Sequence, residues 1–354
     1  MSTFKIATIA GDGIGQEVIP EAKRILYAIE KKFGASFQFQ DFDWGADYYF
    51  RHGRMCPPDF LDRLRPVDAI LLGAIGHPRI PDHITLNGLL LPIRRGFDQF
   101  VNVRPAVLYR GVQSPLALRR GEQIDMMVVR ENTEGEYSQV GGFVYHEQPE
   151  EVAIQTSVFT RRGTERVIRY AFELARKRNK KNRVTSVTKS NAQGYGMVLW
   201  DRTFAAVASE YPDIATESLL VDAAAMNFIR RPESFDVVVA SNLFGDILSD
   251  ISAILVGSMG LAPSANLDPT RRFPSMFEPV HGSAPDIAGK GMANPLAAIF
   301  SVAMMLEHLG MPAAAESVNV AVAGVLAEGN LRTPDLSGTS KTGEVTEGVL
   351  GRLG

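Results

Sequence analysis

Residues 6–26 read IATIAGDGIGQEVIPEAKRIL. An apolar run enters a turn that contains Gly11, Gly13 and Gly15, and a helical pattern of apolar residues follows. This order predicts a strand, a tight turn and a helix at the start of the chain. Glycine-rich turns between a strand and a helix can bind dinucleotides, so the spacing of the glycines has to be tested.

The glycine spacing does not match the dinucleotide fingerprint. That fingerprint needs the order G-x-G-x-x-G and an acidic residue about 20 positions later. Gln16 stands where the third glycine should be, and the segment KKFGAS at 31–36 contains no acidic residue. A turn that uses glycine for its backbone conformation is therefore a better interpretation than a Rossmann site.

Strand-like runs alternate with helical patterns along the chain. The runs include AILLGA (69–74), IDMMVVR (124–130), RVTSVTK (183–189) and FDVVVAS (235–241). This alternation predicts an α/β protein with a largely parallel sheet. No low-complexity linker divides the chain, which indicates domains that share it discontinuously.

Two stretches depart from this alternation. Residues 135–163 read as extended segments around a turn at Gly141 and Gly142, and they predict either a protruding arm at an oligomer interface or a plain surface hairpin. Residues 261–295 are rich in proline and glycine and lack periodicity. Loops of that length in compact domains usually carry function.

Composition narrows the class of protein. The chain has 354 residues, 45% of them hydrophobic, with 37 Lys and Arg against 40 Asp and Glu, which argues for two domains and against nucleic acid or a membrane as partner. Cys56 is the only cysteine, so an intrachain disulfide and a cysteine-based zinc cluster are excluded. The basic run at 175–183 closes a helical pattern, where cations suit the helix dipole. With no export signal or membrane span expected, we predict a soluble cytoplasmic protein.

Acidic residues form the first candidate site. Asp246 and Asp250, in SNLFGDILSDI, are four residues apart and project from one face of a predicted helix. Their repulsion would be relieved by a cation, and Mg²⁺ or Mn²⁺ suits carboxylate oxygens. Taken alone, such a pair is more often a solvated polar face. Asp222 ends another apolar run and could complete a metal site.

Arginines form the second candidate site. Arg94, Arg104 and Arg130 each lie at or near the end of an apolar segment, where open α/β sheets place ligands. A single such arginine is more often part of a structural ion pair, but three of them indicate a small acid bound by bidentate contacts. Lys189 and Tyr137 are candidate proton-transfer groups.

Six motifs, in this order along the chain, resemble those of the β-decarboxylating dehydrogenases, the family of isocitrate, 3-isopropylmalate, homoisocitrate and tartrate/D-malate dehydrogenases. They are GDGIG, FDQFVNVRP, VVRENTEGEYS, TKSN, SNLFGDILSD and EPVHGSAPDIAGKGMANP. The resemblance runs nearly end to end and looks nearest to the tartrate dehydrogenase/decarboxylase and D-malate dehydrogenase group. It implies an isopropylmalate/isocitrate dehydrogenase-like two-domain α/β fold with a central mixed sheet, not a true Rossmann fold.

The resemblance also implies how the chain is divided. Residues 1–102 with 258–354 would form the cofactor-side domain, and residues 103–257 the substrate, metal and dimerisation domain. The arm at 135–163 would clasp a partner subunit. Lys189 and Asp222 would complete the neighbouring site, which makes the protein a homodimer with shared active sites.

Residue roles follow from the matching motifs. Substrate carboxylates would be bound by Arg94, Arg104 and Arg130. Mg²⁺ or Mn²⁺ would be held by Asp222, Asp246 and Asp250. Lys189 would take the proton of the substrate C2 hydroxyl, and Tyr137 would protonate the enol carbon after CO₂ is lost.

The segment HGSAPDIAGKGMANP (281–295) matches the family's cofactor loop. The resemblance assigns cofactor contacts to His281, Gly282, Ser283, Ala284, Asp286 and Asn294. Because a carboxylate at Asp286 accepts hydrogen bonds from ribose hydroxyls and repels a 2′-phosphate, NAD is expected rather than NADP. K⁺ is a candidate monovalent activator.

The segment PDHITLNGLLLPIRRGFDQF (81–100) bears on the substrate. Its lead-in resembles the tartrate/D-malate group, whereas Leu90 and Leu91 resemble the isopropylmalate enzymes. Asn87 matches neither, and its amide could hydrogen-bond a hydroxyl on the far carbon of tartrate. We expect oxidation with decarboxylation of a 2-hydroxy dicarboxylic acid, tartrate or D-malate. The alternatives are 3-isopropylmalate dehydrogenase of leucine biosynthesis and, more remotely, a non-catalytic regulatory subunit.

Overall fold

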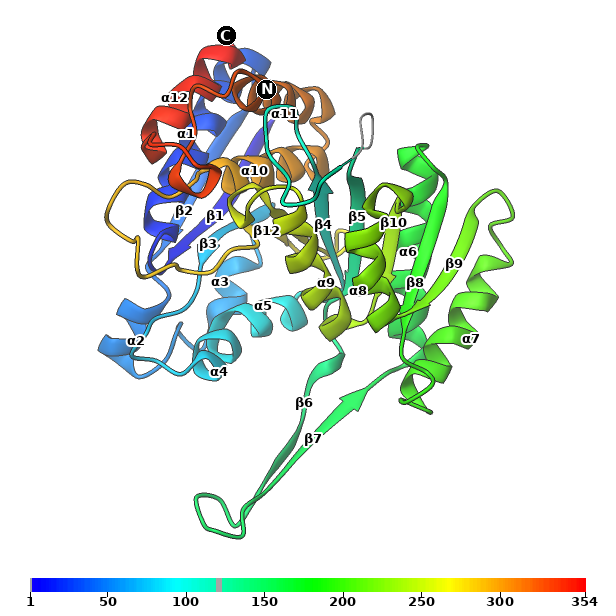
Figure 1. Cartoon of the computed structure of the whole chain (residues 1–354). Coiled ribbons are helices and arrows are strands. Elements are labelled where there is room, and N and C mark those ends of the chain that lie inside the picture. The colour runs from blue at the N-terminus through cyan, green and yellow to red at the C-terminus, as the bar shows by residue number, and fades with distance from the viewer. Residues whose placement is uncertain (1, 119–122) are drawn as a thin grey trace. The chain divides into compact units, whose positions relative to one another are not determined.

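The computed structural model describes residues 2–118 and 123–354, which form two compact units. The first unit comprises Met1–Gln99, Val103–Ile124 and Ser252–Gly354. The second comprises Phe100–Asn102 and Asp125–Ile251. Helices pack on the strands in each unit, so the predicted α/β class is confirmed (Figure 1).

The first unit contains a mixed set of strands. Their order is β2 (Ser36–Phe42), β1 (Thr3–Gly11), β3 (Ala69–Ala74), β12 (Ser275–Pro279), β11 (Pro263–Leu267) and β4 (Val101–Val107, of which residues from 103 onward belong here). Strand β1 pairs in parallel with β2 and β3, and β12 pairs in parallel with β3 and antiparallel with β11. The β11–β12 pair lies inside the stretch 261–295 that the sequence predicts as a loop. The two strands were missed because each has only five residues, too few for a clear period.

The helices of the first unit cover its strands. The predicted strand–turn–helix at the start of the chain is confirmed, since α1 (Gly15–Phe33) follows β1 and buries one apolar face. Helix α10 (Leu296–His308) is apolar nearly all round and is buried against α1, α11 (Pro312–Glu328), β11 and β12, as its composition requires. The helices of this unit after α1 are α2 (Ala46–His52), α3 (Phe60–Leu64), α4 (Asp82–Thr85), a π-helical turn (Leu86–Leu90), α5 (Leu91–Gly96), α10 (Leu296–His308), α11 (Pro312–Glu328), α12 (Thr342–Leu353) and the 3₁₀ turns Met259–Leu261 and Pro334–Leu336.

The second unit contains four parallel strands in the order β5 (Asp125–Glu131), β10 (Val237–Ala240), β8 (Arg183–Thr188) and β9 (Ala215–Leu220). Its helices are α6 (Arg161–Arg178), α7 (Gly196–Ala208), α8 (Val221–Arg230), a 3₁₀ turn (Pro232–Ser234) and the larger part of α9 (Asn242–Leu255). The basic run at 175–183 closes α6 as predicted. There Arg178 pairs with Asp125 and Asp236, so these cations stabilise the fold.

A two-stranded antiparallel hairpin, β6 (Gly135–Val144) and β7 (Val152–Val158), projects from the second unit (Figure 1). The turn predicted at Gly141 and Gly142 is wrong. Both glycines lie within β6 and pair with β7, and residues 145–151 reverse the chain. Gly141 is needed inside the strand because a Cβ there would lie 2.1 Å from the Ile154 carbonyl oxygen.

The division of the chain differs from the expected 1–102 with 258–354 and 103–257 in three places: residues 100–102 belong to the second unit, and residues 252–257 and 103–124 belong to the first. Three contacts join residues 103–118 to the first unit. The Tyr109 ring stacks 5.1 Å from that of Phe300, Ser114 Oγ donates to the Leu255 carbonyl at 2.6 Å, and Arg332 Nη2 donates to the Gly111 carbonyl. Local sequence patterns do not show these long-range contacts.

None of the helices within residues 2–118 and 123–354 has the length and apolar character needed to cross a membrane.

Candidate functional site

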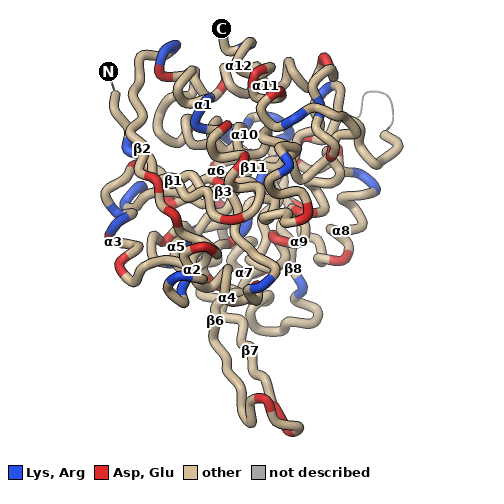
Figure 2. The backbone as a smooth tube through the Cα atoms, turned by 90° about the vertical axis from the view of Figure 1, so that its left-hand side faces the viewer, with Lys and Arg blue, Asp and Glu red and all other residues tan. Residues whose placement is uncertain are grey.

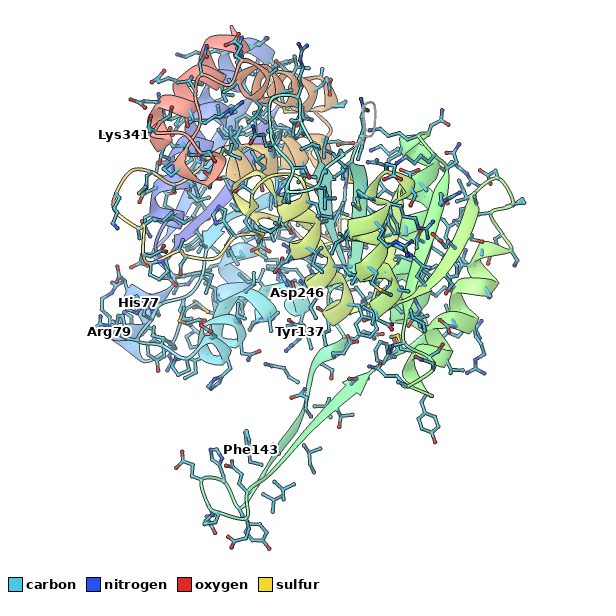
Figure 3. The ribbon with its side chains drawn as sticks, in the orientation of Figure 1. His77, Arg79, Tyr137, Phe143, Asp246 and Lys341 are labelled. Carbon is cyan, nitrogen blue, oxygen red and sulfur yellow. The ribbon has the colours of Figure 1, made fainter. Side chains whose placement is uncertain are left out.

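Three of the predicted site residues meet in the second unit. Arg130 is the penultimate residue of β5, Tyr137 lies on β6 and Asp246 lies in the second turn of α9. Tyr137 and Asp246 lie close together (Figure 3), and the Tyr137 hydroxyl donates to Asp246 Oδ2 at 2.8 Å. Arg130 Nη1 forms an ion pair with Asp246 Oδ1. The guanidinium carbon of Arg130 lies 5.2 Å from the centre of the Tyr137 ring, a cation–π distance. A cation, a phenol and a carboxylate are therefore in mutual contact.

Asn242, which the sequence did not single out, orients Arg130. Its Oδ1 accepts hydrogen bonds from Arg130 Nε at 3.0 Å and from Nη2 at 2.7 Å. Its Nδ2 donates to the Glu134 carbonyl at 3.1 Å. Gly245 makes room, because a Cβ there would lie 2.7 Å from the Arg130 side chain. Asn242 belongs to the motif SNLFGD, but the motif does not indicate that its side chain binds Arg130, which lies 112 residues earlier in the chain.

A buried carboxylate supports this arrangement from the other side. Glu131 Oε1 accepts from the Thr133 N–H at 2.8 Å and from the Thr133 hydroxyl at 2.9 Å, while Oε2 accepts from the Glu134 N–H at 3.0 Å. Burial raises the pKa of Glu131, and the backbone hydrogen bonds of Thr133 and Glu134 oppose that shift. Glu131 thus fixes the turn that leads from β5 to Tyr137.

Glu136 anchors the beginning of α9. Its carboxylate accepts from the Leu243 N–H at 3.1 Å and from the Ser241 hydroxyl at 2.9 Å. A negative charge at this end of a helix is favoured by the helix dipole. Glu136 therefore fixes the strand that carries Tyr137 against the helix that carries Asp246.

Lys189 and Asp222 form a second cluster in the same unit. Lys189 follows β8, Asp222 is the second residue of α8, and Lys189 Nζ lies 2.9 Å from Asp222 Oδ1. This hydrogen bond lowers the pKa of Asp222. Within the described ranges of this one chain, no three His, Cys, Asp or Glu side chains are grouped as a metal site. Asp222 is therefore grouped with Lys189 and not with Asp246 and Asp250.

In the first unit, Arg94 lies on α5 with a side chain that is only 4% exposed. Its Nη2 lies 2.8 Å from Glu278 Oε1, which also accepts from Asn266 Nδ2 at 2.8 Å. Its Nε is buried without a protein acceptor among the described residues. Arg104, on β4, is also buried. Glu278 and Asn266 were not predicted.

The π-helical turn Leu86–Leu90 immediately precedes α5. Asn87 Nδ2 donates to the His83 carbonyl at 2.7 Å, which leaves the buried Oδ1 without a donor among the described residues. Leu90 packs partly against the apolar core of this unit, and Leu91 is buried. Asn87 Oδ1 is thus an acceptor that a ligand could use.

The predicted cofactor loop borders a pocket of about 660 Å³ in the first unit. One wall is residues 75–82, which include His77 and Arg79 (Figure 3), and the other contains Gly282 and Ser283. Ala284, next in the loop, has a φ of 40°, a conformation that costs a non-glycine residue energy and is concentrated at binding sites.

His281 tests whether this loop fits a nucleotide. Its Nδ1 lies 3.0 Å from the Gly282 carbonyl, which can only accept, so Nδ1 carries the proton and Nε2 is an acceptor. Nε2 is buried without a partner among the described residues, and burial lowers the pKa of His281, which favours the neutral ring. An amino or hydroxyl donor of a nucleotide fits this acceptor.

Asn294 and Asp286 extend the loop. Asn294 Nδ2 donates to Asp335 Oδ2 at 3.0 Å, and the Ser258 hydroxyl donates to the same oxygen at 2.5 Å. Asp286 is exposed and available to ribose hydroxyls. Asp335 was not predicted, because it comes 41 residues after Asn294 in a segment without a recognised motif.

Comparisons with known proteins agree with this arrangement. A family model described as isocitrate/isopropylmalate dehydrogenase matches residues 5–349. The chain belongs to this family. A tartrate dehydrogenase/decarboxylase of Pseudomonas putida is 50% identical over 99% of this chain and 98% of its own, and so is a D-malate dehydrogenase [decarboxylating] of Escherichia coli (strain K12).

The fold agrees as well. The crystal structure of an isocitrate dehydrogenase from Methylococcus capsulatus superposes with a TM-score of 0.89, at 37% identity over 99% of both chains. The family and the fold that the six motifs indicate are confirmed.

Proposed function

We propose that this isocitrate/isopropylmalate dehydrogenase family member oxidises and decarboxylates a 2-hydroxy dicarboxylic acid, tartrate or D-malate, with NAD and Mg²⁺ or Mn²⁺. The observation that carries the proposal is the contact among Arg130, Tyr137 and Asp246. It joins a cation for a carboxylate, a hydroxyl for proton transfer and a carboxylate suited to a hard metal ion. The names of the two relatives at 50% identity favour tartrate and D-malate.

The residues of this chain then have distinct tasks. Arg94, Arg104 and Arg130 orient the two substrate carboxylates, with the guanidinium fork fixing their direction. Lys189 takes the proton of the C2 hydroxyl as that carbon becomes a ketone. The β-carboxylate leaves as CO₂, the electron pair of the broken C–C bond forms an enolate, and Tyr137 protonates the carbon of that enolate to give the keto product.

Two bound groups complete this chemistry. NAD, when bound, accepts the hydride from C2, and a divalent ion supplies a Lewis acid for the developing negative charge. Asp246 and Asp250, one helical turn apart on α9, and Asp222 offer the oxygen ligands that suit Mg²⁺ or Mn²⁺. His281, Asp286 and Asn294 would bind the adenosine part of NAD.

Asn87 bears on the substrate. Its Oδ1 has no donor among the described residues, and that atom can accept from a hydroxyl on the far carbon. Tartrate carries such a hydroxyl, whereas the alkyl group of 3-isopropylmalate would leave Oδ1 unpaired. Asn87 thus favours tartrate over the isopropylmalate alternative.

The direct test follows NADH formation with D-malate, L-tartrate and 3-isopropylmalate, each with Mn²⁺ and a potassium salt. We expect turnover of D-malate or tartrate, and NAD to be used much better than NADP because Asp286 repels a 2′-phosphate. Efficient turnover of 3-isopropylmalate alone would show that the substrate assignment is wrong. No turnover of any of the three would favour the regulatory subunit.

We also infer that the chain forms a homodimer through its arm. Val140, Phe143, Tyr145 and Ile154 of the hairpin are 49%, 61%, 60% and 56% exposed, which is unusual for large apolar side chains on a narrow hairpin. Acidic residues gather at the tip of the hairpin (Figure 2). The exposed apolar residues Val140, Phe143 and Ile154 lie on the strands β6 and β7. A two-stranded hairpin gains stability when a second copy covers such a surface.

Phe143→Asp is therefore expected to shift the protein from dimer to monomer and to remove most of its activity. Light scattering coupled to gel filtration measures the mass. Val320→Asp is the matched control, because Val320 is an apolar residue that is 60% exposed on α11 of the first unit and does not belong to the arm. A Phe143→Asp variant that remains a dimer with normal activity would contradict the inferred role of the arm.

A further inference from the structure

The pocket of the first unit has two walls that are about 200 residues apart in the sequence. Residues 75–82 form one wall, and Gly282, Ser283 and Pro285 form the other. The walls approach closely, since a Cβ on Gly76 would lie 3.3 Å from Ser283 Oγ. A pocket built in this way keeps its width only if a third segment holds both walls.

Asp12, in the opening GDGIG motif, holds the first wall. Its side chain is only 6% exposed, and its Oδ2 accepts a hydrogen bond from the Gly76 N–H at 2.8 Å. Its Oδ1 accepts from the Ala46 N–H at 2.7 Å, and its own N–H donates to the Ala74 carbonyl at 2.7 Å. The carboxylate of Asp12 thus joins the start of α2 to the first residues of the wall, and its backbone N–H adds a bond to the end of β3.

The next two residues hold the second wall. The Ile14 N–H donates to the Ser283 carbonyl at 2.9 Å. Gly13 makes this approach possible, because its φ is 52° and a Cβ there would lie 2.0 Å from the same carbonyl oxygen. Further along the loop, the Gly289 N–H donates to Glu17 Oε1 at 2.6 Å. Three consecutive residues of the turn after β1, Asp12 to Ile14, therefore contact both walls of the pocket.

We propose that Asp12, Gly13 and Ile14 form a clamp that sets the width of the NAD pocket, with Asp12 as its main positioning residue. The inference rests on the proposed function for the assignment of the pocket to NAD. The clamp acts through Gly76 and Ser283, and Asp12 itself does not touch the cofactor. The GDGIG glycines therefore serve dinucleotide binding by holding the walls, not by cradling the pyrophosphate.

The test is Asp12→Asn, which keeps the size of the side chain but turns one acceptor oxygen into a donor. One of the two N–H groups from Gly76 and Ala46 then loses its acceptor and faces an N–H. We expect the Kd for NADH, measured by titration calorimetry, to rise about tenfold or more. The value of kcat at saturating NAD should stay within about twofold, because the groups that perform the chemistry are untouched.

Asp268→Asn is the matched control. Asp268 is a fully buried carboxylate of the same unit that also accepts two backbone N–H bonds, from Thr270 and Arg272, both at 3.1 Å. It does not line the pocket. Both substitutions should lower the midpoint of thermal unfolding, but only Asp12→Asn should weaken NADH binding.

Gly13→Ala is the second variant and acts on the other wall. It should raise the Kd for NADH in the same way, so the clamp can be judged even if Asp12→Asn does not fold. Unchanged NADH affinity in the folded variants, or equal weakening by Asp268→Asn, would overturn the clamp. If the unaltered protein binds no NADH, the assignment of the pocket to NAD is wrong instead.

Discussion

Arg130→Ala should lower kcat/KM for the hydroxy acid by about a thousandfold. The Arg130 side chain is 2% exposed, and in the proposed site its fork binds a substrate carboxylate through two charge-assisted hydrogen bonds, each worth about 1.5–3 kcal/mol. Since about 1.4 kcal/mol corresponds to a factor of ten, the loss of two such bonds amounts to about two to four powers of ten in kcat/KM. Steady-state kinetics with D-malate or tartrate measures the loss.

Arg178→Ala is the control for this variant. Arg178 has a side chain that is 7% exposed in the same unit, and it pairs with Asp125 and Asp236 away from Tyr137 and Asp246. It should destabilise the protein without a comparable loss of kcat/KM in the folded fraction. Arg130→Lys should be intermediate, because lysine keeps the charge but cannot bond Asn242 and Asp246 with a planar fork. Equal kinetic losses in Arg130→Ala and Arg178→Ala would remove Arg130 from the substrate site.

Lys189→Ala should lower kcat by about 10²–10⁴, the usual contribution of a positioned acid or base. Binding of NADH and Mn²⁺ should change little, because neither depends on a base at the C2 hydroxyl. Lys180→Ala is the control, since Lys180 pairs with Asp125 elsewhere in the same unit. Near-normal turnover by Lys189→Ala would remove this residue from the mechanism.

A mixing experiment tests whether Lys189 serves the neighbouring subunit. If each active site takes Arg130 from one subunit and Lys189 from the other, a dimer of Arg130→Ala with Lys189→Ala chains contains one intact site. Random reassembly of the two inactive variants should then restore about a quarter of wild-type activity, because half of the dimers are mixed and each has one working site. Inactive mixtures whose dimers have demonstrably exchanged subunits would place both residues in the same subunit's site.

The motifs located most of the candidate site, but not the contacts within it. Asp246 and Asp250 were identified as a pair that calls for a cation, and the structure supplies one to Asp246 from its own chain, Arg130. Asn242, Glu131 and Glu136 were missed, although each lies within or beside a quoted motif. Their roles depend on hydrogen bonds across more than 100 residues of sequence, apart from the turn that Glu131 holds locally.

The hairpin shows the same limit. The sequence predicted an extended arm at 135–163, and the glycine pair seemed to mark its turn. Gly141 instead admits the backbone of the opposite strand, a need that arises only when β6 and β7 are paired. The sequence showed where the glycines lie, but it did not show that Gly141 is needed because the opposite strand approaches closely.

The sequence by itself determined the local features. The strand, turn and helix at residues 3–33 follow from hydrophobic period and glycine placement, and the spacing of Asp246 and Asp250 on one helix face follows from helix geometry. Only the tertiary structure decided that Arg130 meets Asp246, that Lys189 meets Asp222, and that Asp12 and Ile14 hold two distant loops. Those contacts join segments that become neighbours only after the strands have assembled into sheets. A local sequence pattern does not indicate which distant segments will become neighbours.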